Sequence, residues 1–371
     1  MGAFAIYRLP YEEQCQLLIQ QEGKPEELPS VSSLSGVEGF VMAPFAVDKR
    51  YPVIVIHPDE TLDITPEDLV NNQQQPWKET LEAILAEPKQ SEKVRNSSYA
   101  NYAIDFANFH SQVLEGEFSK IVLARCVREK YDEGRTPLMM FADACRRYPR
   151  MFVALVSAWR CGTWLMATPE VLLEGMGTHW STMSLAGTMA LEEDQLDFDD
   201  PPSREPVGKY DFRWDIKNIQ EQRFVSTYIT ESLEQVADFI EEKGPYTVRA
   251  GKLVHLRSDF KFTMPYPEDL GRLLGILYPT PAVCGLPKDN ARDFILRNES
   301  TSRQYYSGFA GPLGGSTPTH LYVSLRCMRI DEEGSCLFAG GGIMAGSELQ
   351  VEWKETEDKM CTMKDIMHTN K

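Results

Sequence analysis

From residue 99 to the carboxyl end, the chain alternates short apolar runs with longer segments of helical apolar spacing. Because side chains repeat every two residues in strands and every 3.6 in helices, this pattern predicts both kinds of element. We expect strands at residues 118–127, 151–159, 163–168, 181–185, 254–264, 320–330 and 336–339. We expect helices at residues 99–114, 215–241, 269–277, 289–296 and 348–368. Strands joined by turns and interspersed with long helices predict an α+β fold, with helices packed outside antiparallel sheets.

The first 95 residues are less regular. Residues 39–45 and 51–57 resemble strands, and the polar segment 23–35 resembles a loop. Residues 87–98 are polar and charged, and we interpret them as a surface connection. A chain of 371 residues with 42% hydrophobic content can bury a large core. Such a core suits one large domain or two smaller ones; we expect one large domain with a sandwich-like core, in which residues 1–95 form an N-terminal part.

The formal net charge of -17 repels phosphate backbones and anionic membrane surfaces. No apolar stretch approaches the roughly 20 residues of a membrane helix, and residues 1–10 do not resemble a secretory signal. The eight cysteines include no Cys-x-x-Cys pair, which predicts free thiols in a reducing compartment. We expect a cytoplasmic protein with no nucleic-acid or membrane partner. An anionic small molecule would need a locally positive site.

The closing segment 348–368 carries Glu352, Glu355 and Lys359 at positions i, i+3 and i+7, so they share one helical face. Three consecutive glycines precede it within residues 339–343, where bare backbone can approach a ligand. Two carboxylates one turn apart can hold a hard cation, and magnesium prefers such oxygen ligands. The alternative is a solvated face with a salt bridge between Glu355 and Lys359.

Lys120 lies inside an otherwise apolar strand, where a lysine either extends to the surface or serves as a buried base. Glu170 follows a Thr-Pro turn and precedes an apolar run. It is either a surface glutamate or a carboxyl group that keeps its proton in an apolar site and acts as a general acid.

Glu221 lies on the long predicted helix, and its spacing does not decide between a pocket and solvent. Arg326 lies in an apolar strand and must find an anion, because a guanidinium keeps its proton. That anion is either a structural carboxylate or a substrate. Residues 278–285 contain two prolines and a glycine, which predict a rigid loop.

In this order, the segments resemble the chorismate-utilising enzymes, which include isochorismate, salicylate, anthranilate and aminodeoxychorismate synthases. The resemblance extends from residue 99 to the carboxyl end and is most specific over residues 337–363. It implies a chorismate-binding enzyme fold with a catalytic region at residues 96–371. The implied small-molecule partner is chorismate and the implied cofactor is magnesium.

The resemblance assigns roles residue by residue. Lys120 resembles the base that activates water, and Glu170 resembles the acid that protonates the departing hydroxyl. Glu221 and Glu355 match magnesium ligands, and Glu352 completes the acidic pair on the last helix. The implied substrate-binding residues are Leu185, Ala186, Gly187, Thr188, His255, Tyr306, Arg326, Gly340, Gly341, Gly342 and Lys359. The family's arginine motif begins at Arg303 and continues through Tyr306 to Gly308.

Lys120 favours water as the nucleophile, because amine-adding relatives do not need a base at this position. The resemblance therefore implies an isomerase, an isochorismate synthase in which water attacks C2 and the C4 hydroxyl leaves. Salicylate synthases share the lysine and then eliminate pyruvate, so they remain the alternative. Amine-adding synthases and a noncatalytic carboxylate-binding domain are weaker alternatives.

The chain departs from the family pattern at three positions. The motif Lys-Asp-x-x-Glu-His has Asn218 in place of aspartate and Gln222 in place of histidine, and Tyr278 replaces another usual histidine. These departures put the surroundings of Glu221 in doubt, although Glu221 itself is present. The sequence leaves open whether the product feeds menaquinone, siderophore or salicylate synthesis. We expect a monomer or a weak homodimer.

Overall fold

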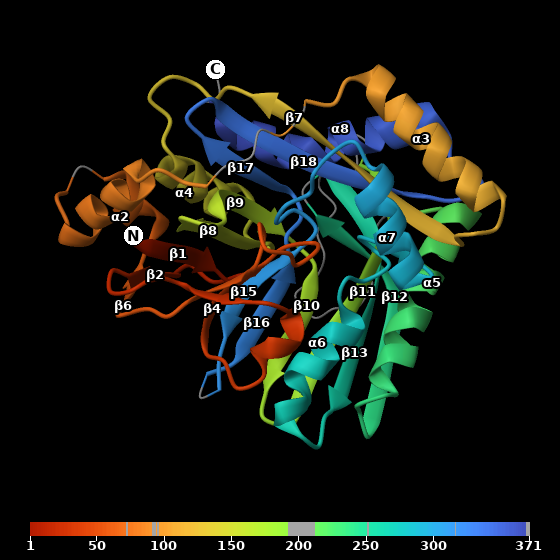
Figure 1. Ribbon diagram of the computed structural model, residues 1–371, viewed down its shortest axis with the longest axis horizontal. Helices are drawn as coiled ribbons and strands as arrows, with labels where there is room; N and C mark the ends of the chain where they lie inside the picture. Colours follow the sequence, from red (N-terminus) through yellow and green to blue (C-terminus); the bar gives the residue numbers. More distant parts are fainter. Residues whose placement is uncertain are drawn as a thin grey trace.

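The computed structural model of the chain describes residues 1–71, 73–90, 94, 96–191, 212–250, 252–315 and 317–368. Its strands form two antiparallel sheets of nine strands each (Figure 1). The first sheet has the order β14 (Gly285–Leu286), β7 (Lys120–Glu129), β18 (Gly334–Ile343), β17 (Cys327–Asp331), β9 (Gly162–Thr168), β8 (Phe152–Ala158), β1 (Ala3–Arg8), β2 (Cys15–Gln20) and β6 (Glu60–Ile64). The second has the order β12 (Phe239–Ala250), β13 (Leu253–Thr263), β11 (His179–Ala190), β10 (Val171–Met176), β16 (Thr319–Val323), β15 (Phe309–Leu313), β4 (Gly39–Ala43), β5 (Val53–Ile56) and β3 (Glu26–Leu28).

The described helices connect and cover these sheets. They are α1 (Pro66–Val70), α2 (Pro76–Ala86), α3 (Tyr99–Leu114), α4 (Pro137–Arg147), α5 (Ile216–Leu233), α6 (Leu270–Leu277), α7 (Lys288–Asn298) and α8 (Leu349–Met367), with short 3-10 turns at Val31–Leu34 and Pro267–Asp269. Thr65 and Ser98 cap α1 and α3 by accepting from backbone N–H groups of the first turn. The helix starts therefore follow local sequence signals.

The core lies between the sheets and under the helices. Phe152 of β8 and Tyr322 of β16 stack across the two sheets with ring centroids 4.3 Å apart. Helices α4 and α8 pack on the other face of the first sheet, and α5 and α6 pack on the second (Figure 1). Helices α3 and α7 cover the edge formed by β7 and β14. The predicted α+β sandwich with outer helices is confirmed.

Residues 1–95 complete both sheets. Their strands β1, β2 and β6 join the first sheet, and β3, β4 and β5 join the second. The apolar face of β1 is fully buried against β8, so this N-terminal part shares the core with the rest of the chain. Within the expected connection at residues 87–98, residues 91–93 and 95 lie outside the described residues, and Val94 is buried.

The predicted helix at residues 215–241 was too long. Helix α5 ends at Leu233, the last of its buried apolar residues, and the chain then enters strand β12 at Phe239. Strand β12 is an edge strand whose residues are mostly exposed. An exposed edge strand has no buried face to impose alternation of apolar and polar residues, so no strand pattern is present there.

The predicted strand at residues 320–330 was wrong at its centre. The chain leaves the second sheet after Val323 and enters the first sheet at Cys327, and Arg326 has φ 44° between them. Both strands are buried, so their apolar residues look continuous in the sequence. The crossing places Arg326 between the two sheets, and not on the face of either strand.

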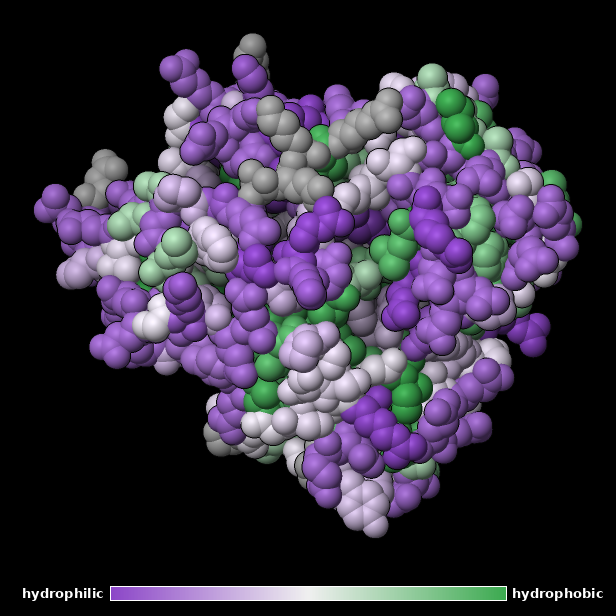
Figure 2. Space-filling view, in the orientation of Figure 1, coloured by the Kyte–Doolittle hydropathy of each residue, from purple (hydrophilic) through white to green (hydrophobic). Residues whose placement is uncertain are grey.

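The surface in Figure 2 is covered mainly by hydrophilic residues, with apolar residues in separate small patches. Among the described residues, no helix has the length and apolar character needed to cross a membrane. The eight cysteines are free, and all but Cys361 are buried. Their predicted state as free thiols is confirmed.

Candidate active site

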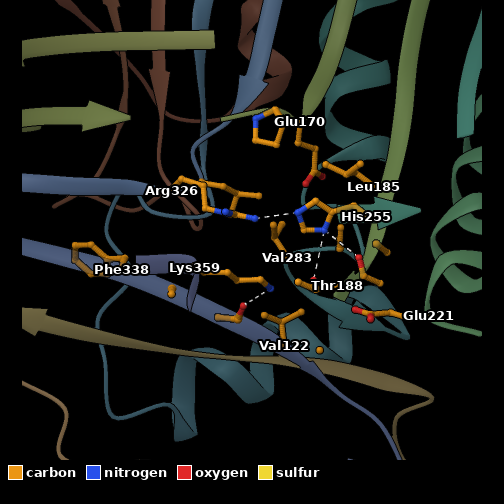
Figure 3. A pocket seen from close by; sticks show the side chains of 18 of the residues that line it. Val122, Glu170, Leu185, Thr188, Glu221, His255, Val283, Arg326, Phe338 and Lys359 are labelled. Atoms are coloured by element: carbon orange, nitrogen blue, oxygen red, sulfur yellow. Dashed lines mark hydrogen bonds between the residues drawn. The ribbon is translucent and has the colours of Figure 1, made fainter. Parts of the chain in front are cut away.

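A cavity opens where β7, β10, β11, β13 and β18 meet the C-terminal helix α8 (Figure 3). Its polar lining residues are Glu170, Thr188, Glu221, His255, Tyr306, Arg326 and Lys359. Its apolar and backbone lining comes from Val122, Pro169, Leu185, Ala186, Gly187, Ala282, Val283, Leu325, Phe338, Ala339, Gly340 and Gly342. An apolar wall with a few converging polar groups is typical of a small-molecule site.

Glu170 lies in the short turn between β9 and β10, where Pro169 follows the end of the strand. Its side chain is buried and points into the cavity beside His255 (Figure 3). Burial raises the pKa of Glu170 to about 8, although Lys120, Lys359 and Arg326 oppose the shift. Glu170 therefore holds a proton at neutral pH and can donate it. The alternative of a surface glutamate is wrong.

Lys120 is the first residue of β7 and is 0% exposed, so it does not extend to the surface. Its Nζ lies 2.8 Å from Oε1 of Glu221 on α5. Burial would raise the pKa of Glu221, but the charges of Lys120, Lys217 and Lys359 together lower it. A Cβ atom at Gly342 would lie 2.5 Å from Glu221 Oε1 and 2.6 Å from Lys120 Cε. Only glycine leaves room for this pair.

Helix α8 presents two further carboxylates, those of Glu352 and Glu355, to strand β18. Glu355 Oε1 lies 2.7 Å from Lys359 Nζ, which also donates to the carbonyl of Gly340 at 2.9 Å. Glu352 is 0% exposed and contacts Lys217 of α5. Burial and the neighbouring Glu355 raise the pKa of Glu352. A buried carboxylate and a partly exposed one are thus held close together on α8.

A buried arginine fixes the position of α8 on β7. Arg125 donates through Nε to Thr356 Oγ1 at 2.6 Å, and its guanidinium lies 3.7 Å from the ring centroid of Trp353. Trp353 also meets the ring of Tyr102 on α3, with centroids 5.3 Å apart. These contacts hold the face of α8 that carries Glu352 against the sheet.

Arg326 is 6% exposed, and among the described residues no carboxylate lies within ion-pair distance of it. Its Nη2 donates to His255 Nε2 at 2.9 Å, and its Nη1 lies 3.4 Å from Thr362 Oγ1. Burial lowers the pKa of Arg326 to about 10, so it remains charged at neutral pH. The structural salt bridge expected as one alternative is not present in the described part of the chain.

His255 on β13 lies at the centre of this cluster (Figure 3). Burial, and then the charge of Arg326, lower its pKa to about 3, so the ring is neutral at neutral pH. Its Nδ1 lies 2.9 Å from the carbonyl oxygen of Gly187 and 3.4 Å from Thr188 Oγ1. Tyr306 stacks on Phe338 nearby, with centroids 5.4 Å apart and an interplanar angle of 15°.

Residues 51–368 match the family of chorismate binding enzymes. The chain belongs to this family. Isochorismate synthase MenF of Escherichia coli (strain K12) is 29% identical over 255 residues, covering 69% of this chain and 57% of MenF. Isochorismate synthase DhbC of Bacillus subtilis (strain 168) is 29% identical over 261 residues, covering 68% of this chain and 64% of DhbC. The chain thus spans less than two thirds of the length of these relatives.

Solved structures share the fold. The structure of MenF, the menaquinone-specific isochorismate synthase from Escherichia coli, matches with TM-score 0.75 and 21% identity over 98% of this chain and 88% of that one. Anthranilate synthase component I from Streptococcus pneumoniae matches with TM-score 0.62 and 17% identity over 97% of this chain and 80% of that one. Synthases with different names share the fold, so the fold alone does not determine which reaction this chain catalyses.

The structure gathers most of the residues that the resemblance singled out. All of them line the cavity except Lys120, Arg303, Gly308, Gly341, Glu352 and Glu355. Lys120 lies beside Glu221 and not in the cavity wall, and Glu355 borders an adjoining open hollow together with Thr188. A Cβ atom at Gly341 would lie 3.0 Å from Glu352 Oε2 and 3.7 Å from Glu355 Oε1, so this glycine gives the two carboxylates access to the strand.

Sequence reasoning missed the apolar wall and one buried pair that supports it. Arg303 does not reach the cavity of this chorismate-binding enzyme. Its guanidinium contacts both carboxylate oxygens of Glu299 at 2.6 and 2.7 Å and donates to the carbonyls of Val122 and Val283. Both valines line the cavity, so Arg303 ties two of its walls together. The spacing of four residues between Glu299 and Arg303 was the signal available in the sequence.

Proposed function

We propose that this chain is an isochorismate synthase, which converts chorismate into isochorismate by attack of water at C2 and loss of the C4 hydroxyl. The observation that carries the proposal is a protonated acid and a buried lysine at one cavity. Glu170 keeps its proton up to about pH 8. Lys120 contacts Glu221, which lies at the far end of the cavity from Glu170 (Figure 3). An acid and a base on separate sides suit a reaction in which one hydroxyl enters and another leaves.

The charges at the cavity suit a dianionic substrate. Arg326 is buried without a carboxylate partner among the described residues, and Lys359 lines the same cavity. These cations supply a locally positive site in a chain of net charge -17. Arg326 with Tyr306 would hold the enolpyruvyl carboxylate, because a guanidinium fork binds carboxylates through two donors.

The acidic residues have the chemistry of a magnesium site. Glu221, Glu352 and Glu355 supply only hard oxygen donors, and the last two reach the same point above Gly341. Among the described residues, no group of three acidic, histidine or cysteine side chains is arranged to hold a metal ion. Each of the three glutamates instead contacts a lysine. We propose Glu221 and Glu355 as the magnesium ligands, with Glu352 beside them.

Bound magnesium would neutralise the ring carboxylate and withdraw electron density from the conjugated system. The remaining steps belong to the chain's own residues. In its neutral amine form, Lys120 removes a proton from the attacking water, and Glu170 protonates the departing hydroxyl. In the reverse direction the two residues exchange roles, since the same transition state is crossed. The apolar wall of Val122, Leu185 and Phe338 keeps other water away from the ring.

Incubation of the purified protein with chorismate and magnesium tests the proposal directly. We expect a product of unchanged mass that separates chromatographically from chorismate, with no release of pyruvate. Salicylate with stoichiometric pyruvate would identify a salicylate synthase instead. Binding of chorismate without any turnover would indicate a noncatalytic binding domain, and neither binding nor turnover would refute the substrate class.

A further inference from the structure

The hydrogen bonds of His255 determine where its single ring proton lies. The carbonyl oxygen of Gly187 can only accept, so Nδ1 at 2.9 Å carries the proton. The guanidinium of Arg326 can only donate, so Nε2 at 2.9 Å must present its lone pair. Both partners therefore require the same neutral tautomer.

The carbonyl that selects this tautomer comes from an irregular place in β11. The register of β11 against β13 shifts between Ala186 and Thr188, and Gly187 has φ 71°. Asn218 of α5 accepts from the backbone N–H of Thr188 at 3.0 Å and so anchors the irregularity. A regular strand would not place this carbonyl beside the ring, because successive carbonyls would all pair with the neighbouring strands.

A neutral acceptor has a different effect on an arginine than a carboxylate has. Arg303 of this chain is held by both oxygens of Glu299, which cancels its charge. Arg326 is held at a comparable level of burial by an uncharged imidazole. Its orientation is fixed and its charge remains available to an anion in the cavity.

We propose that His255 is a positioning residue, which holds Arg326 for the substrate carboxylate through a fixed Nδ1–H tautomer set by the carbonyl of Gly187. The proposal rests on the proposed function, because it takes the anion at Arg326 to be a carboxylate of chorismate. The imidazole itself does not touch the reacting atoms in this role. Its effect therefore falls on substrate binding and not on the chemical step.

Two amide variants separate the two ring nitrogens. His255→Gln reaches the position of Nε2 and can accept from Arg326, whereas His255→Asn reaches only the position of Nδ1 and donates to Gly187. We expect His255→Asn to raise the KM for chorismate about 10- to 100-fold, since a hydrogen bond to a charged group is lost. We expect His255→Gln to stay within about threefold of wild type in KM. Both should keep kcat within about threefold.

Equal effects of the two amides, or losses in kcat at unchanged KM, would overturn the proposal. A second measurement does not depend on turnover. Nitrogen NMR of histidine-labelled wild-type protein, which has 6 histidines, should show one ring with a protonated Nδ1 and an unprotonated Nε2 from about pH 5.5 to 8. The signal of His255 is identified as the one that disappears in the spectrum of His255→Asn. An Nε2–H tautomer or a titration in this range would refute the positioning role. Because wild-type chorismate turnover is measured in parallel, failure of the proposed function appears separately as no turnover with an intact tautomer.

Discussion

The two ends of the cavity balance charge in opposite ways. At the end near α8, each of three glutamates contacts one lysine. These pairs are Lys120–Glu221, Lys217–Glu352 and Lys359–Glu355. At the other end, Arg326 has a neutral histidine as its closest partner, and Glu170 keeps its proton (Figure 3). Among the described residues, the charges at one end are paired within the protein, and the positive charge at the other end has no carboxylate partner.

This difference indicates what each end can take up. A cation can take the place of a lysine ammonium group as the partner of a glutamate, so the paired end suits exchange of a lysine contact for a metal. An anion at the other end would pair with the charge of Arg326, which has no carboxylate partner among the described residues. The comparison makes distinct predictions for each end, because substitutions should change metal binding at the first and substrate binding at the second.

The largest effect is expected from Glu355→Gln at the paired end. The amide cannot serve as a charged magnesium ligand, so we expect no measurable turnover at any magnesium concentration, with a nearly unchanged melting temperature. Glu357→Gln is the matched control, because Glu357 lies on the same helix but contacts Arg125. Turnover with circular dichroism as a folding check is the measurement. Full wild-type activity in excess EDTA would contradict a metal role for this end.

Lys120→Ala should lower kcat by about 100- to 10,000-fold, the usual cost of removing a general base. Ammonia needs no deprotonation before attack, so weak amination at high pH is expected to survive in this variant. Lys78→Ala removes another buried lysine, one that donates to Asn71 far from the cavity, and should lower stability without a comparable loss of rate. A Lys120→Ala enzyme within about threefold of wild type would show that the lysine only pairs with Glu221.

The contrast between the two ends also explains what the sequence could predict. Glu352, Glu355 and Lys359 follow helical spacing on α8, and a local rule predicts their shared face. Lys120 comes from β7 and Glu170 from the turn between β9 and β10, so only the resemblance to a family placed them at one site. The α+β fold followed from periodicity, and the edge strand β12 was missed because it has no buried face.

The unpaired end depends on features with no periodic signal. Arg326 has φ 44° at a crossing between sheets, which an apolar run on both sides conceals. The tautomer of His255 depends on a carbonyl at the irregularity of β11, and this depends in turn on Asn218. Such long-range backbone geometry is decided by tertiary packing and not by residue type. The sequence therefore predicted which residues matter more readily than how they are held.

The pH dependence of turnover tests the protonated state of Glu170. Burial disfavours the charged form, so Glu170 is protonated below about pH 8 and loses its proton above it. We expect kcat/KM for chorismate to fall above about pH 8, approaching tenfold per pH unit. His255, with a pKa of about 3, should add no step near neutrality. A profile that stays flat through about pH 9.5 would show that Glu170 does not supply the proton.

Lys217→Met should strengthen magnesium binding, because Lys217 competes with a cation for Glu352. A partly exposed ion pair contributes about 0.5–1 kcal/mol, so we expect about two- to fivefold tighter binding by calorimetry without substrate. Lys252→Met is the control, since Lys252 contacts Asp365 at the exposed end of α8. Weaker magnesium binding in Lys217→Met would mean that the lysine holds Glu352 in place and does not compete for it.

The smallest effect is expected from Asn218→Asp, which restores the residue usual in the family. In the wild-type chain, Asn218 Oδ1 accepts from the N–H of Thr188 at 3.0 Å. An aspartate oxygen can accept the same hydrogen bond, so the irregularity of β11 should persist. We expect the KM for chorismate to change by about twofold at most, through added negative charge near the unpaired end. Asn218→Ala removes the acceptor and should raise KM about two- to tenfold, the cost of one lost hydrogen bond. KM values for both variants, measured at one pH and ionic strength, distinguish the effect of the added charge from the loss of the backbone anchor. If Asn218→Asp has the larger effect, charge and not backbone anchoring governs this position.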